Sequence, residues 1–279
     1  MSFSEVRAAG IGWPVRLTYP VVFVCFFLSG ASGLLYQVVW TRLAFAQFGV
    51  ITPVLSLIIS VFMLGLGLGS VYGPRWAISL GRRFGVSSLQ LYAGAELLTA
   101  VGAFAVPASL ALGGSLLLRA GAAGSAGFLA LSAVCIVLTL LPWCVMMGAT
   151  IPLMMEFVRR SAASSPGSFS FLYAANVLGA AAGAIVSAVV LIELLGLHMT
   201  GGVGAAGNML AAALALGLGR ATPEQAQVRA AAPHAAAGAL PRRPGWPAAV
   251  LFTTGFASMG FEVCWTRDFT FALATTIYA

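Results

Sequence analysis

Two glutamates lie inside long apolar stretches, where a carboxyl group is chemically out of place. Glu96 is about ten residues into an apolar run that begins near Val86, and Glu262 is about fourteen residues into a run that begins near Ala248. At about 1.5 Å per residue, ten residues reach close to the middle of a bilayer. An ionised carboxylate there costs about 2.5–3.5 kcal/mol on insertion scales. Two interpretations stay open: a structural group, protonated or hydrogen-bonded to a neighbouring helix, and a site for a cation.

Aromatic and polar side chains near these glutamates could complete a cation site. An aromatic face attracts a cation, and spaced carboxylates with aromatic walls suit a flexible, multiply charged amine. Arg42 and Arg267 each follow a tryptophan by two residues; they either anchor a helix at the membrane interface or pair with Glu96 or Glu262. The candidate substrate or ion site comprises Glu96, Gln37, Glu262, Tyr36, Trp40, Trp265, Arg42 and Arg267.

We expect no catalytic residue, no cofactor-binding residue and no metal ligand. The dinucleotide fingerprint requires a strand before it and a helix after it, and the matching glycine patterns lie inside apolar runs instead. The four cysteines also lie in apolar segments, without a CxxC pair or a histidine at metal spacing. The patterns are Gly65-x-Gly67-x-Gly69 and Gly202-x-Gly204-x-x-Gly207, and the cysteines are Cys25, Cys135, Cys144 and Cys264.

The composition is that of a membrane protein. The chain is 60% hydrophobic and 8% charged, with a mean hydropathy of +1.00, whereas soluble domains carry about 25% charged residues. Runs of about 20 apolar residues are long enough to cross a bilayer. We therefore expect an all-α polytopic bundle of about seven transmembrane helices, near Leu17–Tyr36, Ile51–Tyr72, Val86–Leu110, Phe128–Leu153, Phe169–Leu195, Met199–Leu218 and Ala248–Ala272.

Glycines at four-residue spacing predict close helix packing. Small residues at this spacing let two helix backbones approach, which drives association in lipid. The predicted packing faces carry Gly65, Gly69 and Gly73 on one helix, and Gly179 and Gly183 on another.

The arginines predict the orientation. All basic residues are arginine; with a cytoplasmic N-terminus, eleven lie on the cytoplasmic side and three on the other. This bias predicts a bacterial-type inner (cytoplasmic) membrane protein with its N-terminus inside. No basic face with interleaved aromatics suggests nucleic acid. The expected division is a six-helix bundle at 1–218, a flexible cytoplasmic linker at 219–247, and the first helix of a second, truncated half at 248–279.

An internal repeat fits this division. Aligning Trp40 with Trp265 brings residues 27–42 and 252–267 into register, with matching Phe, Gly, Val, Trp, Thr and Arg, and with Gln37 opposite Glu262. A repeat in the same direction needs an even number of crossings between its copies. Parallel six-helix halves are the layout of major-facilitator transporters.

Several blocks resemble the membrane region of fused major-facilitator-like/spermidine synthase proteins. They are residues 27–42, residues 63–70 (Met-Leu-Gly-Leu-Gly-Leu-Gly-Ser), residues 147–153 (Met-Gly-Ala-Thr-Ile-Pro-Leu) and residues 172–179 (Leu-Tyr-Ala-Ala-Asn-Val-Leu-Gly). The resemblance implies a soluble aminopropyltransferase-like domain that binds decarboxylated S-adenosylmethionine and a polyamine. No such domain is in this sequence, so none of its enzymatic residues transfers to this chain.

Three functional hypotheses stay open. The leading one is a membrane module of a polyamine-related fusion protein that transports or handles a cationic or amphiphilic small molecule. The second is a scaffold that anchors an enzyme or docks into a larger membrane complex. The third is the non-catalytic N-terminal part of an aminopropyltransferase. The expected partners are the lipid bilayer, a polyamine or other cationic molecule, and other membrane subunits.

Overall fold

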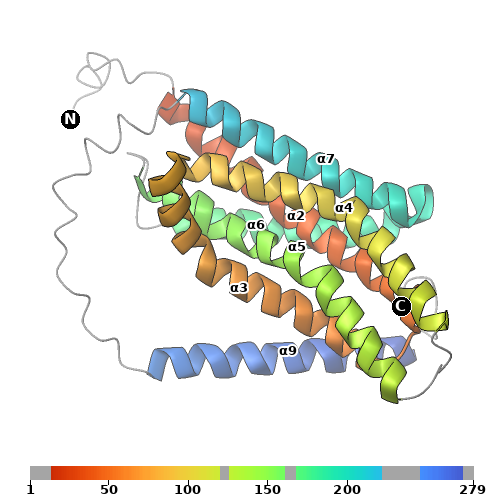
Figure 1. Ribbon diagram of the computed structural model, residues 1–279. Helices are drawn as coiled ribbons and strands as arrows, with labels where there is room; N and C mark the ends of the chain where they lie inside the picture. The colour runs from red at the N-terminus through yellow and green to blue at the C-terminus, as the bar shows by residue number, and fades with distance from the viewer. Residues whose placement is uncertain (1–13, 120–125, 161–167, 222–245, 273–279) are drawn as a thin grey trace, which may run out of the picture.

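The computed structural model describes residues 14–119, 126–160, 168–221 and 246–272 (Figure 1). All regular structure in these ranges is helical, and they contain no strand. The helices are α2 (Pro14–Phe48), α3 (Thr52–Phe84), α4 (Ser88–Arg119), α5 (Ala126–Arg160), α6 (Ser168–Val186), the π-helical turn η1 (Ser187–Leu191), α7 (Ile192–Ala221) and α9 (Trp246–Ala272).

Five stretches in the described ranges are long and apolar enough to cross a membrane, so this part of the chain is suited to a lipid environment. Helix α9 is not among them, and the expected total of seven crossings stays a prediction. The fifth stretch has 52 residues, which would measure about 78 Å as one straight helix, more than twice the hydrocarbon core. The stretches are Thr18–Phe48, Thr52–Phe84, Ser88–Leu117, Gly127–Arg159 and Phe169–Arg220.

The long fifth stretch turns back on itself at Gly196. The backbone there is non-helical, with φ 73° and ψ 173°, a conformation that is essentially restricted to glycine. Helix α6 runs alongside α2 in the same direction, because Gly179 lies against Phe27 and Gly183 against Ala31.

Helix α7 runs the opposite way along α2. The Ser32 hydroxyl donates to the carbonyl oxygen of Gly204 at 3.0 Å, and the Cys25 thiol donates to that of Ala211 at 3.6 Å. Ala211, the later of the two α7 residues, therefore meets Cys25, the earlier of the two α2 residues, as expected for antiparallel helices. The turn falls between the two helices expected at Phe169–Leu195 and Met199–Leu218.

The spaced glycines lie at close helix contacts. On α3, a Cβ at Gly69 would overlap the carbonyl oxygen of Val145 on α5, and one at Gly65 would overlap Cys144. On α6, a Cβ at Gly179 or Gly183 would overlap a carbonyl oxygen of α2. Both glycine faces are therefore occupied inside the bundle, where backbone packing holds α3 to α5 and α6 to α2.

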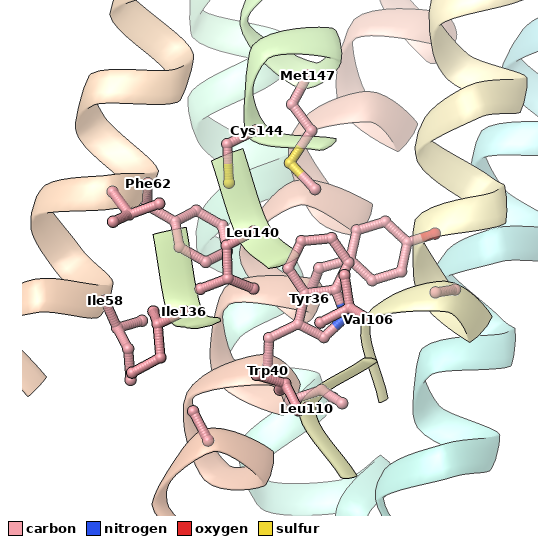
Figure 2. Close-up of a cluster of buried hydrophobic side chains, with 14 of the residues drawn as sticks. Tyr36, Trp40, Ile58, Phe62, Val106, Leu110, Ile136, Leu140, Cys144 and Met147 are labelled. Atoms are coloured by element: carbon pink, nitrogen blue, oxygen red, sulfur yellow. The ribbon is translucent and has the colours of Figure 1, made fainter. Parts of the chain in front are cut away.

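Aromatic residues of α2 fill the middle of the core. Trp40 and Tyr36 are fully buried and stacked, with ring centroids 5.1 Å apart, and Phe62 of α3 lies 5.8 Å from Trp40 (Figure 2). Large apolar side chains such as Leu138 and Leu194 are exposed on the outside of the bundle. A lipid-facing surface explains that exposure.

Some expectations concern residues outside the described ranges. Most of the predicted linker at 219–247 is at residues 222–245, and the N-terminal residues 1–13 and the last residues 273–279 are also outside. The predicted linker and orientation therefore stay predictions.

Candidate functional site

A cavity of about 740 Å³ lies between α2, α3, α5 and α6. This volume is within the roughly 300–1,000 Å³ that is typical of small-molecule sites. Its walls are mostly apolar, and a few polar side chains face it. The polar lining residues are Ser29, Gln37, Ser70, Thr150, Glu156, Arg159, Tyr173 and Asn176.

The end of the cavity formed by the last turns of α5 carries charge. The Glu156 carboxylate accepts a bond from the Arg159 guanidinium at 2.6 Å. Phe169 and Tyr173 of α6 stack beside it, with ring centroids 5.9 Å apart. This end therefore combines an acidic group, its basic partner and an aromatic pair.

Gln37 lies toward the other end of the cavity. Ser29 of α2 and Thr150 of α5 are at the same level, since their hydroxyl oxygens are 3.4 Å apart. Glu156 is six residues from Thr150, and Gln37 is eight residues from Ser29 in the opposite direction. At about 1.5 Å per residue, Gln37 and Glu156 are separated by roughly 20 Å along the bundle axis.

Glu262 of α9 approaches Gln37. The Gln37 side chain lies within hydrogen-bonding reach of the Glu262 carboxyl group, which is half-buried. Helix α9 packs on α3 and runs in the same direction as α2 (Figure 1). Its Trp265 side chain is 60% exposed and forms no wall of the cavity.

Glu96 of α4 lies on the other side of α2, away from the cavity lining. Its side chain is only 1% exposed. The hydroxyl groups of Ser29 and Tyr92 lie within hydrogen-bonding reach of its carboxyl group, while its Oε1 has no hydrogen-bond partner among the described residues. The Asn208 amide of α7 approaches the Glu96 carbonyl oxygen at 3.5 Å.

The aromatic residues proposed as cavity walls face the core instead. Tyr36 and Trp40 pack with α3, α4 and α5, and the Tyr36 hydroxyl points toward α4 (Figure 2). The Tyr36 hydroxyl and the Trp40 indole nitrogen have no hydrogen-bond partner among the described residues. The structure thus separates the predicted group: Gln37 faces the cavity with Glu262 beside it, whereas Tyr36, Trp40 and Glu96 are interior.

Among the described side chains, no arginine pairs with Glu96. An ion pair joins Glu156 and Arg159 instead. Arg42 is partly exposed near the end of α2, and the side chain of Arg267 lies outside the described residues. The expected pairing of these arginines with Glu96 or Glu262 stays a prediction.

Glycine patterns and metal-binding residues offer no further site in the described part of the chain. Gly202, Gly204 and Gly207 all lie within α7, and Gly65, Gly67 and Gly69 within α3. No cluster of histidine, cysteine and carboxylate side chains there could hold a metal ion.

Sequence reasoning missed several residues that the fold brings to these two places. Ser29, Tyr92 and Asn208 surround Glu96, and Glu156 and Tyr173 line the cavity. Asn208 carried a signal, because an amide inside an apolar helix needs a partner. Ser29 carried none, since a serine among small residues is common in membrane helices.

The chain is similar to a known enzyme over most of its length. It is 33% identical over 209 residues to polyamine aminopropyltransferase 2 of Streptomyces coelicolor, a match that covers 71% of this chain. The chain spans only about a third of the length of that relative, with 33% of it covered. No protein-family model matches the chain. No solved structure matches it either.

This similarity supports a relation to spermidine synthase-like proteins, which the sequence blocks had suggested. It supports a polyamine-related link for the chain. The major-facilitator-like arrangement and the internal repeat stay predictions.

Proposed function

We propose that this chain is the membrane module of a polyamine-related protein and that its cavity binds a cationic or amphiphilic small molecule. The observation that carries the proposal is the cavity between α2, α3, α5 and α6, with Glu156 toward one end and Gln37, with Glu262 beside it, toward the other. Apolar walls between two acidic groups suit an elongated amine, whose methylene chain packs while its ends pair. The relative's name makes a polyamine the first ligand to test.

The predicted repeat supports a two-half, major-facilitator-like layout. In the alignment of residues 27–42 with 252–267, Gln37 matches Glu262, and these two side chains also meet in the structure. Residues near a two-fold axis contact their own equivalents across it. A contact between matched positions of α2 and α9 is therefore what a parallel repeat would produce.

The scaffold hypothesis loses one of its supports. It relied on glycine faces that could dock onto a partner, but those of α3 and α6 are packed against α5 and α2. A partner would have to use another surface. The third hypothesis, a non-catalytic part of an aminopropyltransferase, is compatible with a cavity that delivers or collects a polyamine.

Calorimetric titration of the purified chain with spermidine tests the proposal. We expect saturable binding that Glu156→Gln weakens by about tenfold to a hundredfold, because a bond to a charged group contributes about 1.5–3 kcal/mol. The matched control is Glu193→Gln, which removes a carboxylate from an exposed position that does not line the cavity. That variant should bind as the wild type does.

Two results would contradict the proposal. One is the absence of spermidine binding to a folded wild-type chain, which would favour the scaffold hypothesis. The other is equal weakening by Glu156→Gln and Glu193→Gln, which would indicate a general effect of surface charge rather than a site in the cavity.

A further inference from the structure

Ser29 touches both the cavity and the buried Glu96. It lines the cavity and is partly exposed, whereas Glu96 is 1% exposed and does not line it. The Ser29 hydroxyl lies within hydrogen-bonding reach of the Glu96 carboxyl group. A single hydroxyl group therefore separates an interior acid from a space that water can enter.

The Ser29 hydroxyl can both donate and accept a hydrogen bond. A serine or threonine hydroxyl has one proton to donate. Thr150 donates its proton to the carbonyl oxygen of Met147 at 2.7 Å. In the 3.4 Å contact between Thr150 and Ser29, either hydroxyl can be the donor. The Ser29 hydroxyl can therefore accept a proton from Glu96 and donate its own proton to water in the cavity.

A second hydroxyl lies near Glu96. Tyr92 donates to the carbonyl oxygen of Cys25 at 3.3 Å. The Glu96 side chain is 1% exposed and forms no ion pair with a described arginine. Because burial disfavours an unpaired charge, this environment favours the neutral acid, which has one proton to give.

The described surroundings of Glu96 contain no positively charged group that could neutralise its carboxylate. The titratable side chains close enough to interact with Glu96 are Cys25 and Tyr36 of α2 and Tyr92 of its own helix. Helix α7 contributes Asn208, which does not titrate, and α5 contributes Thr150 through Ser29. No described arginine forms an ion pair with Glu96.

We propose that Glu96 is a proton-binding site and that Ser29 passes its proton between the carboxyl group and water in the cavity. In release, the O–H bond of the Glu96 acid breaks as its proton moves to the Ser29 oxygen. Ser29 at the same time gives its own proton to a cavity water. The products are a carboxylate, an unchanged serine and a hydronium ion, and uptake is the reverse.

The proton site has a consequence for the cavity that rests on the proposed function. Release of the proton places a negative charge directly behind Ser29, where it attracts a cation in the cavity. Uptake removes that attraction. Protonation of Glu96 would then set the affinity of the cavity for its cation, although the proton site itself requires no ligand.

Infrared difference spectroscopy of the full chain in detergent, without any polyamine, tests the site. A protonated carboxyl group has a carbonyl band distinct from that of a carboxylate, and transfer to D₂O shifts it. We expect such a band in the wild type, its loss in Glu96→Gln and its retention in Glu193→Gln. Ser29→Ala should keep the band but slow its shift in D₂O by about a hundredfold, the lower end of what a positioned proton-transfer group contributes.

Ser32→Ala is the matched control for Ser29→Ala. Ser32 is on the same helix, but its hydroxyl donates to Gly204 of α7 and does not line the cavity. Exchange in this variant should be as fast as in the wild type. If Glu96→Gln does not fold, Glu96→Asp should show a displaced band.

Three outcomes would overturn the inference. A wild-type spectrum without a protonated-carboxyl band would show that Glu96 is ionised. A band that survives unchanged in Glu96→Gln and Glu96→Asp would belong to another residue. Equal exchange rates in Ser29→Ala, Ser32→Ala and the wild type would exclude Ser29 as the route. None of these outcomes depends on spermidine binding, so the proton site and the proposed function can fail separately.

Discussion

Gly69 of α3 faces the carbonyl oxygen of Val145 on α5 so closely that no side-chain atom fits between them. The contact sets the distance between the two helices, which form one wall of the cavity. Leu66 and Ser70, which flank Gly69 in the chain, both line the cavity. Packing by glycine and the shape of the candidate site are therefore linked.

Gly69→Ala should destabilise the bundle. The added Cβ overlaps a backbone carbonyl, which cannot move away as a flexible side chain would, and overpacking typically costs about 1–3 kcal/mol. Thermal unfolding in detergent measures the effect. Gly67→Ala is the matched control, since a Cβ at Gly67 meets no atom within 4 Å. Equal melting temperatures for the two variants would mean that α3 and α5 are not held at this distance.

Gly196→Ala should weaken the turn between α6 and α7. With φ at 73° and ψ at 173°, the residue occupies a region that costs about 1–3 kcal/mol for a residue with a Cβ. Gly202→Ala, in a helical part of α7 with no atom within 4 Å of the added Cβ, should be tolerated. Limited proteolysis near the turn and thermal unfolding report the difference. A Gly196→Ala variant as stable as Gly202→Ala would contradict the turn at Gly196.

Tyr36 and Trp40 should respond differently to truncation although both are fully buried. Trp40→Ala removes a large side chain from the core, a change that typically costs about 3–5 kcal/mol. Tyr36→Phe removes only a hydroxyl that has no partner among the described residues, so stability should stay the same or increase. Equilibrium unfolding of both variants measures this. A substantial loss in Tyr36→Phe would show that the hydroxyl makes a bond in the folded chain.

The sequence predicted where the helices lie better than it predicted which side of each helix faces the core. Apolar run length predicted long membrane-type helices, and the glycine spacing drew attention to residues of α3 and α6 that lie against α5 and α2. Both patterns depend on local chemistry. The faces of α2 were not predictable, since a helix that is apolar on all sides has no periodicity to orient it. Tyr36 and Gln37 are neighbours in the chain but face the core and the cavity respectively.

The candidate site was predictable only in part for the same reason. Glu96 stood out because a carboxyl group at membrane depth is costly, and this requires no knowledge of the fold. Its partner Ser29 is 67 residues away in the chain, and only the packing of α2 on α4 brings them together. The cavity is formed by four helices together, so no local sequence pattern predicts it.

The orientation in the membrane is the remaining prediction, and cysteine labelling in intact cells tests it. The eleven-to-three arginine bias places the N-terminus inside, so α2 should end outside and α3 should return. Val50 lies just after α2 and is 66% exposed, while Arg83 is an exposed residue of the last turn of α3. An impermeant maleimide should therefore label Val50→Cys from outside and leave Arg83→Cys unlabelled until the cells are broken. The parent chain, which has an exposed Cys264 of its own, provides the background. The opposite pattern, with Arg83→Cys labelled from outside and Val50→Cys protected, would invert the topology and place the Glu156 end of the cavity on the outer side.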